Sequence, residues 1–164
     1  MTLGQFTEPR LLIPHLLSDR QDGAIQELTK RLAATGRIQN APAFLEAVLK
    51  REAELPTFVG EGVAVPHVRG GAVPKLSIAV GLSSVGIPWS WDTRRVVKVV
   101  FLFAVPLTEA QTYLSLLSGL SSLINDEMAF DALRRATQPE EMLSVLNAVR
   151  LLRMSVPSSQ PARR

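Results

Sequence analysis

The sequence predicts an α/β fold, a three-layer sandwich in which a small mixed β-sheet carries helices on both faces. Three observations support this prediction. Apolar residues recur at helical spacing in two segments before residue 56 and in further segments after residue 108. Between them, residues 76–83 alternate with strand period, and residues 96–105 are almost all apolar, as in a central strand covered on both faces. The 164 residues suffice for one domain with a substantial core.

The composition excludes several classes of function. There is no cysteine, which rules out disulfides and thiol chemistry, and two histidines are too few for a histidine metal cluster, so we expect no metal and no cofactor. No apolar run reaches the roughly 18 residues of a membrane span, and no signal peptide is evident. We therefore expect a cytoplasmic protein without membrane insertion. The net charge of +3 derives from arginines near the C-terminus, which argues against nucleic-acid binding.

The N-terminal residues 1–8 are interpreted as a loose lead-in. An apolar cluster over residues 11–17, broken by Pro14, should seat this end of the chain on the core. His15 falls inside that cluster, where a structural histidine with satisfied hydrogen bonds is a more frequent finding than a ligand.

Two helices are expected next. The first follows the capping residue Asp22 and stops at Gly36, which suits a left-handed C-terminal cap. The second starts at Asn40 with Pro42 in its first turn, a favourable combination for a helix N-terminus. Pro56 ends this second helix.

The stretch after Pro56 leads to a histidine. Gly60 and Gly62 allow a tight turn, and residues 63–65 have the pattern of a short buried strand. Pro66 fixes its own backbone and ends that strand. His67 is therefore predicted to lie at a strand end.

Two longer strands are expected after this histidine. Residues 68–71 are interpreted as a mobile loop and residues 76–83 as a strand. Residues 86–89 predict a turn followed by an irregular segment. Residues 96–105 form the central strand, which Pro106 closes.

Helices complete the domain. One is capped by Thr108, a second covers residues 126–136, and a third begins at Thr137 with a proline and two acidic residues in its first turn. We place one domain at residues 9–150. Residues 151–164 are a basic tail rich in Ser, Pro and Arg, and we expect this tail to be disordered.

His67 is the side chain of this central stretch with obvious chemistry. A neutral imidazole nitrogen is a good nucleophile near pH 7, because the unperturbed pKa of histidine is about 6.5. The alternative is a histidine with a purely structural role, which caps a strand end and forms a hydrogen bond to the backbone. The residues around His67 bear on this choice.

A set of residues that precedes His67 in the chain forms a motif: Arg51-Glu52, Thr57, Gly60, Gly62, Val63-Ala64-Val65 and Pro66-His67. This motif resembles the active-site signature of the enzyme IIA domains of the phosphotransferase system (PTS), of the fructose/mannitol type (type 2). The nitrogen-regulatory enzyme IIA branch is the most similar. The resemblance extends over most of residues 9–149.

The resemblance implies both a fold and a reaction. In such domains the histidine accepts a phosphoryl group from an HPr-type phosphohistidine carrier, so His67 would be the nucleophile. Arg51 would neutralise phosphate oxygens, for which a guanidinium is well suited. Thr57 would donate hydrogen bonds to the phosphate or position the loop, and Arg69 is an additional nearby cation. The target would be a PTS IIB domain or a regulated transporter or kinase.

Three positions depart from the family pattern. Val68 follows the histidine where a smaller residue is usual, and a branched side chain there should narrow access to the ring. Tyr113 stands where the family has a second histidine, and a phenol is a poor proton acceptor at neutral pH. Ser90 replaces a frequent aspartate.

Two hypotheses of different class remain. The first is a phosphocarrier or regulator that is phosphorylated on His67 and signals by its phosphorylation state. The second is a docking module that has lost phosphotransfer and regulates a transporter or kinase by binding. A purely structural domain is the least favoured reading. Apolar surface around Trp89 and Trp91 is a candidate for self-association as a homo-oligomer.

Overall fold

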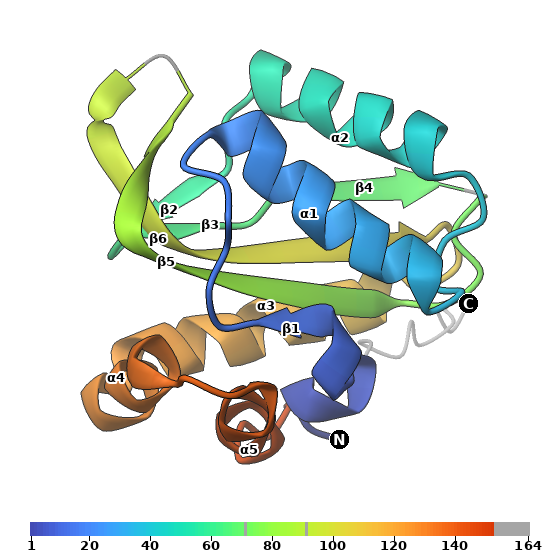
Figure 1. Cartoon of the computed structure of the whole chain (residues 1–164). Helices are drawn as coiled ribbons and strands as arrows, with labels where there is room; N and C mark the ends of the chain where they lie inside the picture. The colour runs from blue at the N-terminus through green and yellow to red at the C-terminus, as the bar shows by residue number, and fades with distance from the viewer. Residues whose placement is uncertain (71, 91, 153–164) are drawn as a thin grey trace, which may run out of the picture.

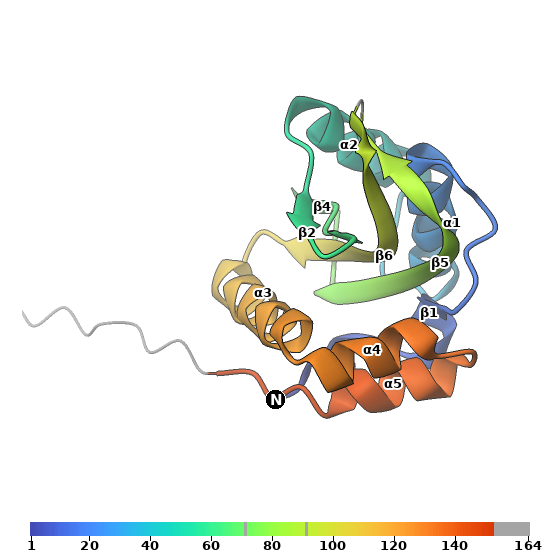
Figure 2. The same cartoon turned by 90° about the vertical axis from the view of Figure 1, so that its left-hand side faces the viewer.

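A computed structural model of the chain describes residues 1–70, 72–90 and 92–152. The chain folds into three layers with a β-sheet in the middle (Figure 1). One face of the sheet is covered by α1 (Gln21–Ala34) and α2 (Ala41–Glu54). The other face is covered by α3 (Ala110–Asn125), α4 (Glu127–Arg135) and α5 (Pro139–Asn147), as Figure 2 shows from the side. The predicted α/β sandwich with helices on both faces is confirmed.

The sheet has six strands, β1 (Leu12–Ile13), β2 (Phe58–Gly60), β3 (Val63–Ala64), β4 (His67–Gly70), β5 (Ser77–Trp89) and β6 (Asp92–Pro106). Their order is β1-β5-β6-β3-β2, and β4 also pairs with β6. The β5–β6 and β2–β3 pairs are antiparallel, whereas β1 pairs with β5, and β3 and β4 with β6, in parallel. The sheet is therefore mixed, as predicted.

Strand β6 is the centre of the fold because it contributes to two cores. Val99, Phe101 and Phe103 pack toward α3–α5. Val100 and Leu102 alternate with them and pack toward α1 and α2. A strand buried on both faces reads as a continuous apolar run, which explains why the sequence identified this element so clearly.

The prediction for residues 68–71 was wrong over its described part. Residues 67–70 form β4, which pairs in parallel with β6 so that His67 lies opposite Phe103. Four residues carry too little local pattern to predict a strand, and the pairing arises from the exposed edge of β6. Gly71 lies outside the described residues.

The predicted turn at residues 86–89 was also wrong, because β5 continues to Trp89. The strand accommodates an irregularity instead: between Leu82 and Ile87 its pairing register with β6 shifts. Gly86 has a φ of 84° at this bulge, a conformation that favours glycine. Trp89 is fully buried, so it offers no surface for self-association, and Trp91 lies outside the described residues.

Helix starts were predicted with mixed success. The side chain of Asn40 accepts a hydrogen bond from the N–H of Ala43, and α2 begins as expected. Asp126 caps α4 in the same way. Thr108 does not cap α3, because that helix starts at Ala110 with Glu109 at the N-cap position. No helix in the described part of the chain combines the length and the apolar character needed to cross a bilayer.

The N-terminus is part of the core and not a loose lead-in. Residues Leu3–Phe6 form a short 3₁₀ helix, and Leu3 is only 1% exposed. The N–H of Leu3 donates to the carbonyl of Val149 over 3.0 Å, and Thr2 forms a β-bridge with Arg150. His15, by contrast, is exposed and does not lie inside the apolar cluster. Residues 153–164, for which a disordered tail was predicted, lie outside the described residues.

A buried carboxylate connects the layers on the α1–α2 side. Glu52 is 2% exposed and lies on the same face of α2 as Phe44 and Val48, at four-residue spacing. Its oxygens accept hydrogen bonds from four donors: the N–H and the hydroxyl of Thr57, the indole N–H of Trp89 and the amide of Gln21. One side chain thereby joins α1, α2, β5 and the segment that leads into β2.

We expect Leu3→Ala to lower the free energy of unfolding by about 2–5 kcal/mol, because it removes a buried leucine side chain from the α3–α5 core. Urea denaturation followed by circular dichroism measures the change. Leu17→Ala is the matched control, since Leu17 is 92% exposed, and it should change the stability by less than about 0.5 kcal/mol. Equal effects of the two substitutions would show that the N-terminal segment does not belong to the core.

We expect Glu52→Gln to lower the free energy of unfolding by about 1–3 kcal/mol, because a carboxamide has one acceptor oxygen and turns an N–H₂ group toward buried donors. Urea denaturation again provides the measurement. Glu54→Gln makes the same chemical change two residues away at an exposed position and should be neutral. A neutral Glu52→Gln would refute the structural role of this carboxylate.

Candidate functional site

His67 lies where the chain changes from one short strand to another along the same edge of β6. Strand β3 pairs with Val99 and Val100 and ends at Ala64. The carbonyl of Pro66 accepts a hydrogen bond from the N–H of Phe103 over 3.0 Å, and β4 starts with His67 itself. The imidazole is half-buried and lines two hollows of the surface.

The backbone fixes the tautomer of His67. Its Nδ1 lies 3.0 Å from the carbonyl oxygen of Val65. A carbonyl oxygen only accepts hydrogen bonds, so Nδ1 must carry the proton in this contact. In the neutral ring, Nε2 then bears the free electron pair, and it is the nitrogen available for chemistry.

The contact to Val65 is the last of a chain of hydrogen bonds that begins at Glu52. Glu52 accepts from the N–H of Thr57 over 3.1 Å. The carbonyl of Thr57 accepts from the N–H of Val65 over 3.1 Å. The carbonyl of Val65 then accepts from His67. The buried carboxylate of Glu52 and the ring of His67 are therefore connected through backbone groups.

Thr57 is close to this site, but its hydroxyl is turned toward the interior. Both of its donors, the N–H and the hydroxyl, are bonded to Glu52. This geometry fits the second of its two predicted roles, the positioning of the loop. Glu52 was recognised in the sequence as part of the motif but was given no role. Its four-residue spacing from Phe44 and Val48 was the signal that it lies on the buried face of α2.

Tyr113 on α3 lies beside the imidazole. The ring centroids of His67 and Tyr113 are 5.6 Å apart with a tilt of 40°, and Tyr113 also packs edge-on against Phe103 at 5.5 Å. Burial raises the pKa of Tyr113 to about 12, although the positive charge of Arg51 acts in the opposite direction. The phenol is thus neutral at physiological pH and offers an O–H donor next to His67.

Arg51 and Arg69 lie on one side of the ring. With Lys50, Glu54 and His67 they line a hollow of about 370 Å³, called here the cationic hollow. Arg51 is in the last turn of α2, and its Nη1 donates to the carbonyl of Leu55 over 3.2 Å. Among the described residues, three cations and one carboxylate line this hollow. The electrostatic potential inside it is therefore positive and favours the binding of anions.

The other side of the ring is apolar. A second hollow of about 680 Å³, called here the apolar hollow, is lined by His67, Tyr113 and the side chains of Phe58, Val59, Leu117, Leu120 and Ile124. Val59 at its rim is 56% exposed. The structure therefore brings together His67, Arg51, Arg69, Thr57 and Tyr113 between a charged and an apolar surface.

Val68, the first departure, packs against the α1–α2 core, because successive residues of β4 point to opposite sides of the sheet. It also lines the cationic hollow next to His67, so its expected effect on access to the ring stays a prediction. Ser90, the third departure, has a φ of 64°, and its N–H donates to the side chain of Gln21 over 3.1 Å. Within residues 1–70, 72–90 and 92–152, no group of three or more possible metal-binding side chains comes together.

Comparisons with known proteins identify the family of this chain. The profile of the family described as "Phosphoenolpyruvate-dependent sugar phosphotransferase system, EIIA 2" matches residues 5–149. The chain is 40% identical over 129 residues to the PTS 2-O-alpha-mannosyl-D-glycerate-specific EIIABC component of Escherichia coli, covering 77% of this chain but only 20% of that protein. It is 32% identical to the PTS fructose-specific EIIA component of Haloferax volcanii, of which it covers 84%.

Regulatory proteins match as well. A nitrogen regulatory protein of Bradyrhizobium diazoefficiens is 31% identical over 150 residues, covering 89% of this chain and 95% of that protein. The crystal structure of the nitrogen regulatory protein IIA-Ntr from Neisseria meningitidis has the same fold, with a TM-score of 0.78 at 20% identity over 87% of this chain and 97% of that one. The chain belongs to the EIIA type 2 family of the phosphoenolpyruvate-dependent sugar phosphotransferase system.

Proposed function

We propose that this protein is a phosphocarrier and regulatory domain that accepts a phosphoryl group on Nε2 of His67 from an HPr-type phosphohistidine protein. The observation that supports this best is the hydrogen bond from Nδ1 to the carbonyl of Val65. It leaves the Nε2 electron pair free on a half-exposed ring that borders the cationic hollow. Family membership supports the same reaction.

The transfer needs little covalent chemistry from the protein. The N–P bond of the donor's phosphohistidine breaks and leaves its electron pair on the donor nitrogen, while Nε2 of His67 forms the new N–P bond. The imidazole gains positive charge in this step, and the Nδ1–H shares that charge with the carbonyl of Val65. The proton on Nδ1 stays in place throughout, so no external base is required.

Cations near the ring stabilise the transferred group. Arg51 and Arg69 line the hollow into which the phosphoryl oxygens would project, and a guanidinium binds such oxygens with several fixed donors. Tyr113 supplies a neutral O–H donor where the family pattern has a histidine. Thr57 contributes by holding the loop through Glu52.

The apolar hollow beside His67 fits the docking of a protein partner. An HPr-type donor would contact this surface first, and the target, a PTS IIB domain or a regulated transporter or kinase, would use the same surface later. A solved structure of enzyme IIA mannitol from Escherichia coli with phosphorylated enzyme IIB mannitol has the same fold, with a TM-score of 0.71 at 21% identity. The longer match to a nitrogen regulatory protein favours a regulatory target for this chain.

The alternative function is a docking module that is not phosphorylated. Tyr113 favours it, because a neutral phenol cannot accept a proton as a second histidine would. The two functions share the apolar hollow and differ in whether His67 carries a phosphoryl group. A phosphorylation assay therefore separates them.

We expect the protein to gain the mass of one phosphoryl group when it is incubated with phosphoenolpyruvate, enzyme I and an HPr-type carrier, because Nε2 of His67 is free to attack. Intact-protein mass spectrometry measures the gain. His67→Ala should abolish it, whereas His15→Ala, which removes the other histidine of the chain, should leave it unchanged. Absence of the label with every competent donor would support the docking module.

Arg51→Gln provides a second arm of the same assay. It keeps a hydrogen-bonding side chain but removes the charge, and we expect the rate of labelling to fall by about 10–100-fold. Lys30→Gln removes one charge from an exposed position of α1 and should keep the full rate.

We expect the single tyrosine of the chain to titrate with a midpoint near pH 12 in the folded protein and near pH 10 in urea, because burial disfavours the phenolate. Ultraviolet absorbance of the phenolate measures both midpoints, with circular dichroism as the check of folding. Between these pH values the unfolded chain releases a proton that the folded chain keeps, so the stability should fall as the pH rises. A midpoint near pH 10 in folded protein would contradict the buried, neutral phenol.

A further inference from the structure

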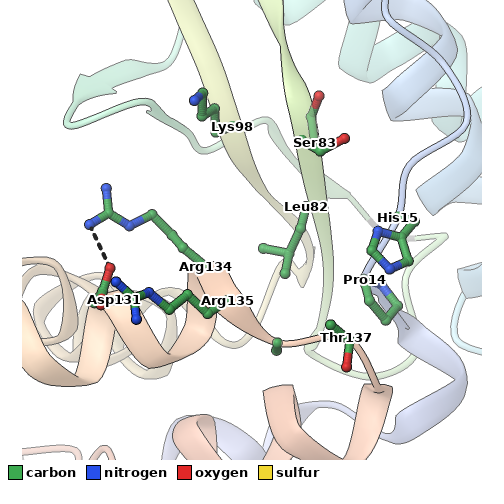
Figure 3. A pocket seen from close by; sticks show the side chains of 11 residues that line it. Pro14, His15, Leu82, Ser83, Lys98, Asp131, Arg134, Arg135 and Thr137 are labelled. Atoms are coloured by element: carbon green, nitrogen blue, oxygen red, sulfur yellow. Dashed lines mark hydrogen bonds and ion pairs between the residues drawn. The ribbon is translucent and has the colours of Figure 1, made fainter.

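A second polar cavity lies away from His67, between the sheet and the end of α4. It has a volume of about 440 Å³ and is lined by residues from the loop after β1, from β5 and β6, and from the end of α4 (Figure 3). His15, which we expected inside an apolar cluster, lies at one wall of it. The function proposed above makes no use of this cavity.

The cavity is separate from the phosphorylation site. Its strand residue Lys98 precedes Phe103, the pairing partner of His67, by five positions in β6, which corresponds to roughly 16 Å along a strand. In the part of the chain that the structure describes, no residue lines both this cavity and either hollow beside His67. A ligand here would therefore not compete directly with a phosphoryl group on His67.

The charges around the cavity are mainly positive. Lys98 enters from β6 and Arg134 and Arg135 from the last turn of α4 (Figure 3). Among the described residues, Asp131 is the one acidic residue of the lining, and it pairs with both arginines, at 3.4 Å and 3.0 Å. Three cations and one carboxylate leave a net charge of +2 with His15 neutral. Guanidinium groups that share one carboxylate keep further N–H donors for an anion.

A buried serine also lines this cavity. Ser83 lines it and is only 7% exposed. Its Oγ accepts a hydrogen bond from the N–H of Gly86 over 3.1 Å, and a hydroxyl that accepts in this way can still donate its own proton to another acceptor. The bulge of β5 around Gly86 places this hydroxyl together with Ser84 at the cavity.

We propose that this cavity binds a small, phosphate-bearing polyanion. Tetrahedral phosphate oxygens would accept from Lys98, from the free N–H groups of Arg134 and from the hydroxyl of Ser83. Such charge-assisted hydrogen bonds are the usual basis of phosphate recognition in proteins. The lining also includes the apolar residues Leu82 and Pro14, and the volume of about 440 Å³ suits a compact ligand.

Titration of the ¹⁵N-labelled protein with pyrophosphate, followed by NMR, tests the proposal. We expect saturable amide shifts at Ser83, Lys98 and Arg134. The double variant Lys98→Gln/Arg134→Gln should raise the dissociation constant by about tenfold or more, because it removes two of the three cations. Ser83→Ala, which keeps all charges, should raise it by about threefold. Circular dichroism confirms that each variant is folded.

The matched control is Lys30→Gln/Lys75→Gln, which also removes two positive charges, but from exposed positions outside the cavity. It should change the dissociation constant by less than about twofold. The proposal fails if shifts are confined to Arg51, His67 and Arg69, if no saturable shift occurs, or if the control weakens binding as much as the cavity variant. Because the readout is local to each site, these results are independent of whether His67 is phosphorylated.

Discussion

The position of the His67 imidazole depends on the buried carboxylate of Glu52. This group has no contact with His67, yet it holds both donors of Thr57, and Thr57 holds Val65, whose carbonyl orients the ring. The same carboxylate accepts from Trp89 and Gln21, so α1 and β5 are fixed by the same side chain. A buried carboxylate is tolerated only where donors form hydrogen bonds to its oxygens. Here the donors that satisfy Glu52 also fix the segment that leads to His67.

The sheet explains why the site lies at this edge. Strand β6 is long, but the neighbouring edge is shared by two short strands, β3 and β4. Val65 and Pro66 lie between them, where regular pairing is interrupted, and proline has no N–H to contribute to a ladder. The break frees the carbonyl of Val65 to bond a side chain. An apolar surface from α3 and a charged surface from α2 then meet at this break.

The parts of the fold with strong periodicity were predictable, and the parts that arise from pairing at a distance were not. The helices and the apolar strand β6 follow from local pattern. His67, Arg51 and Thr57 were predicted as site residues because their motif resembles the active-site signature of the family. The sequence of strand β4 resembles that of a loop, because its four residues gain their order from β6. The sequence around Leu3 predicts a loose end, because the contact with Val149 joins positions that are far apart in the chain. The bulge of β5 at Gly86 resembles a turn in the sequence. A glycine indicates that a positive φ is possible, but it does not show whether the strand resumes after it.

The bridge between Thr2 and Arg150 has a consequence for how this kind of domain is used in larger proteins. The two ends of the folded unit leave it side by side, with the N–H of Leu151 donating to the carbonyl of Met1 over 2.9 Å. A domain whose two ends are adjacent can be inserted between other domains, or appended to them, without distortion of its own core. The matched proteins range from one of similar length to one about four times as long, and a unit with adjacent ends can serve in both.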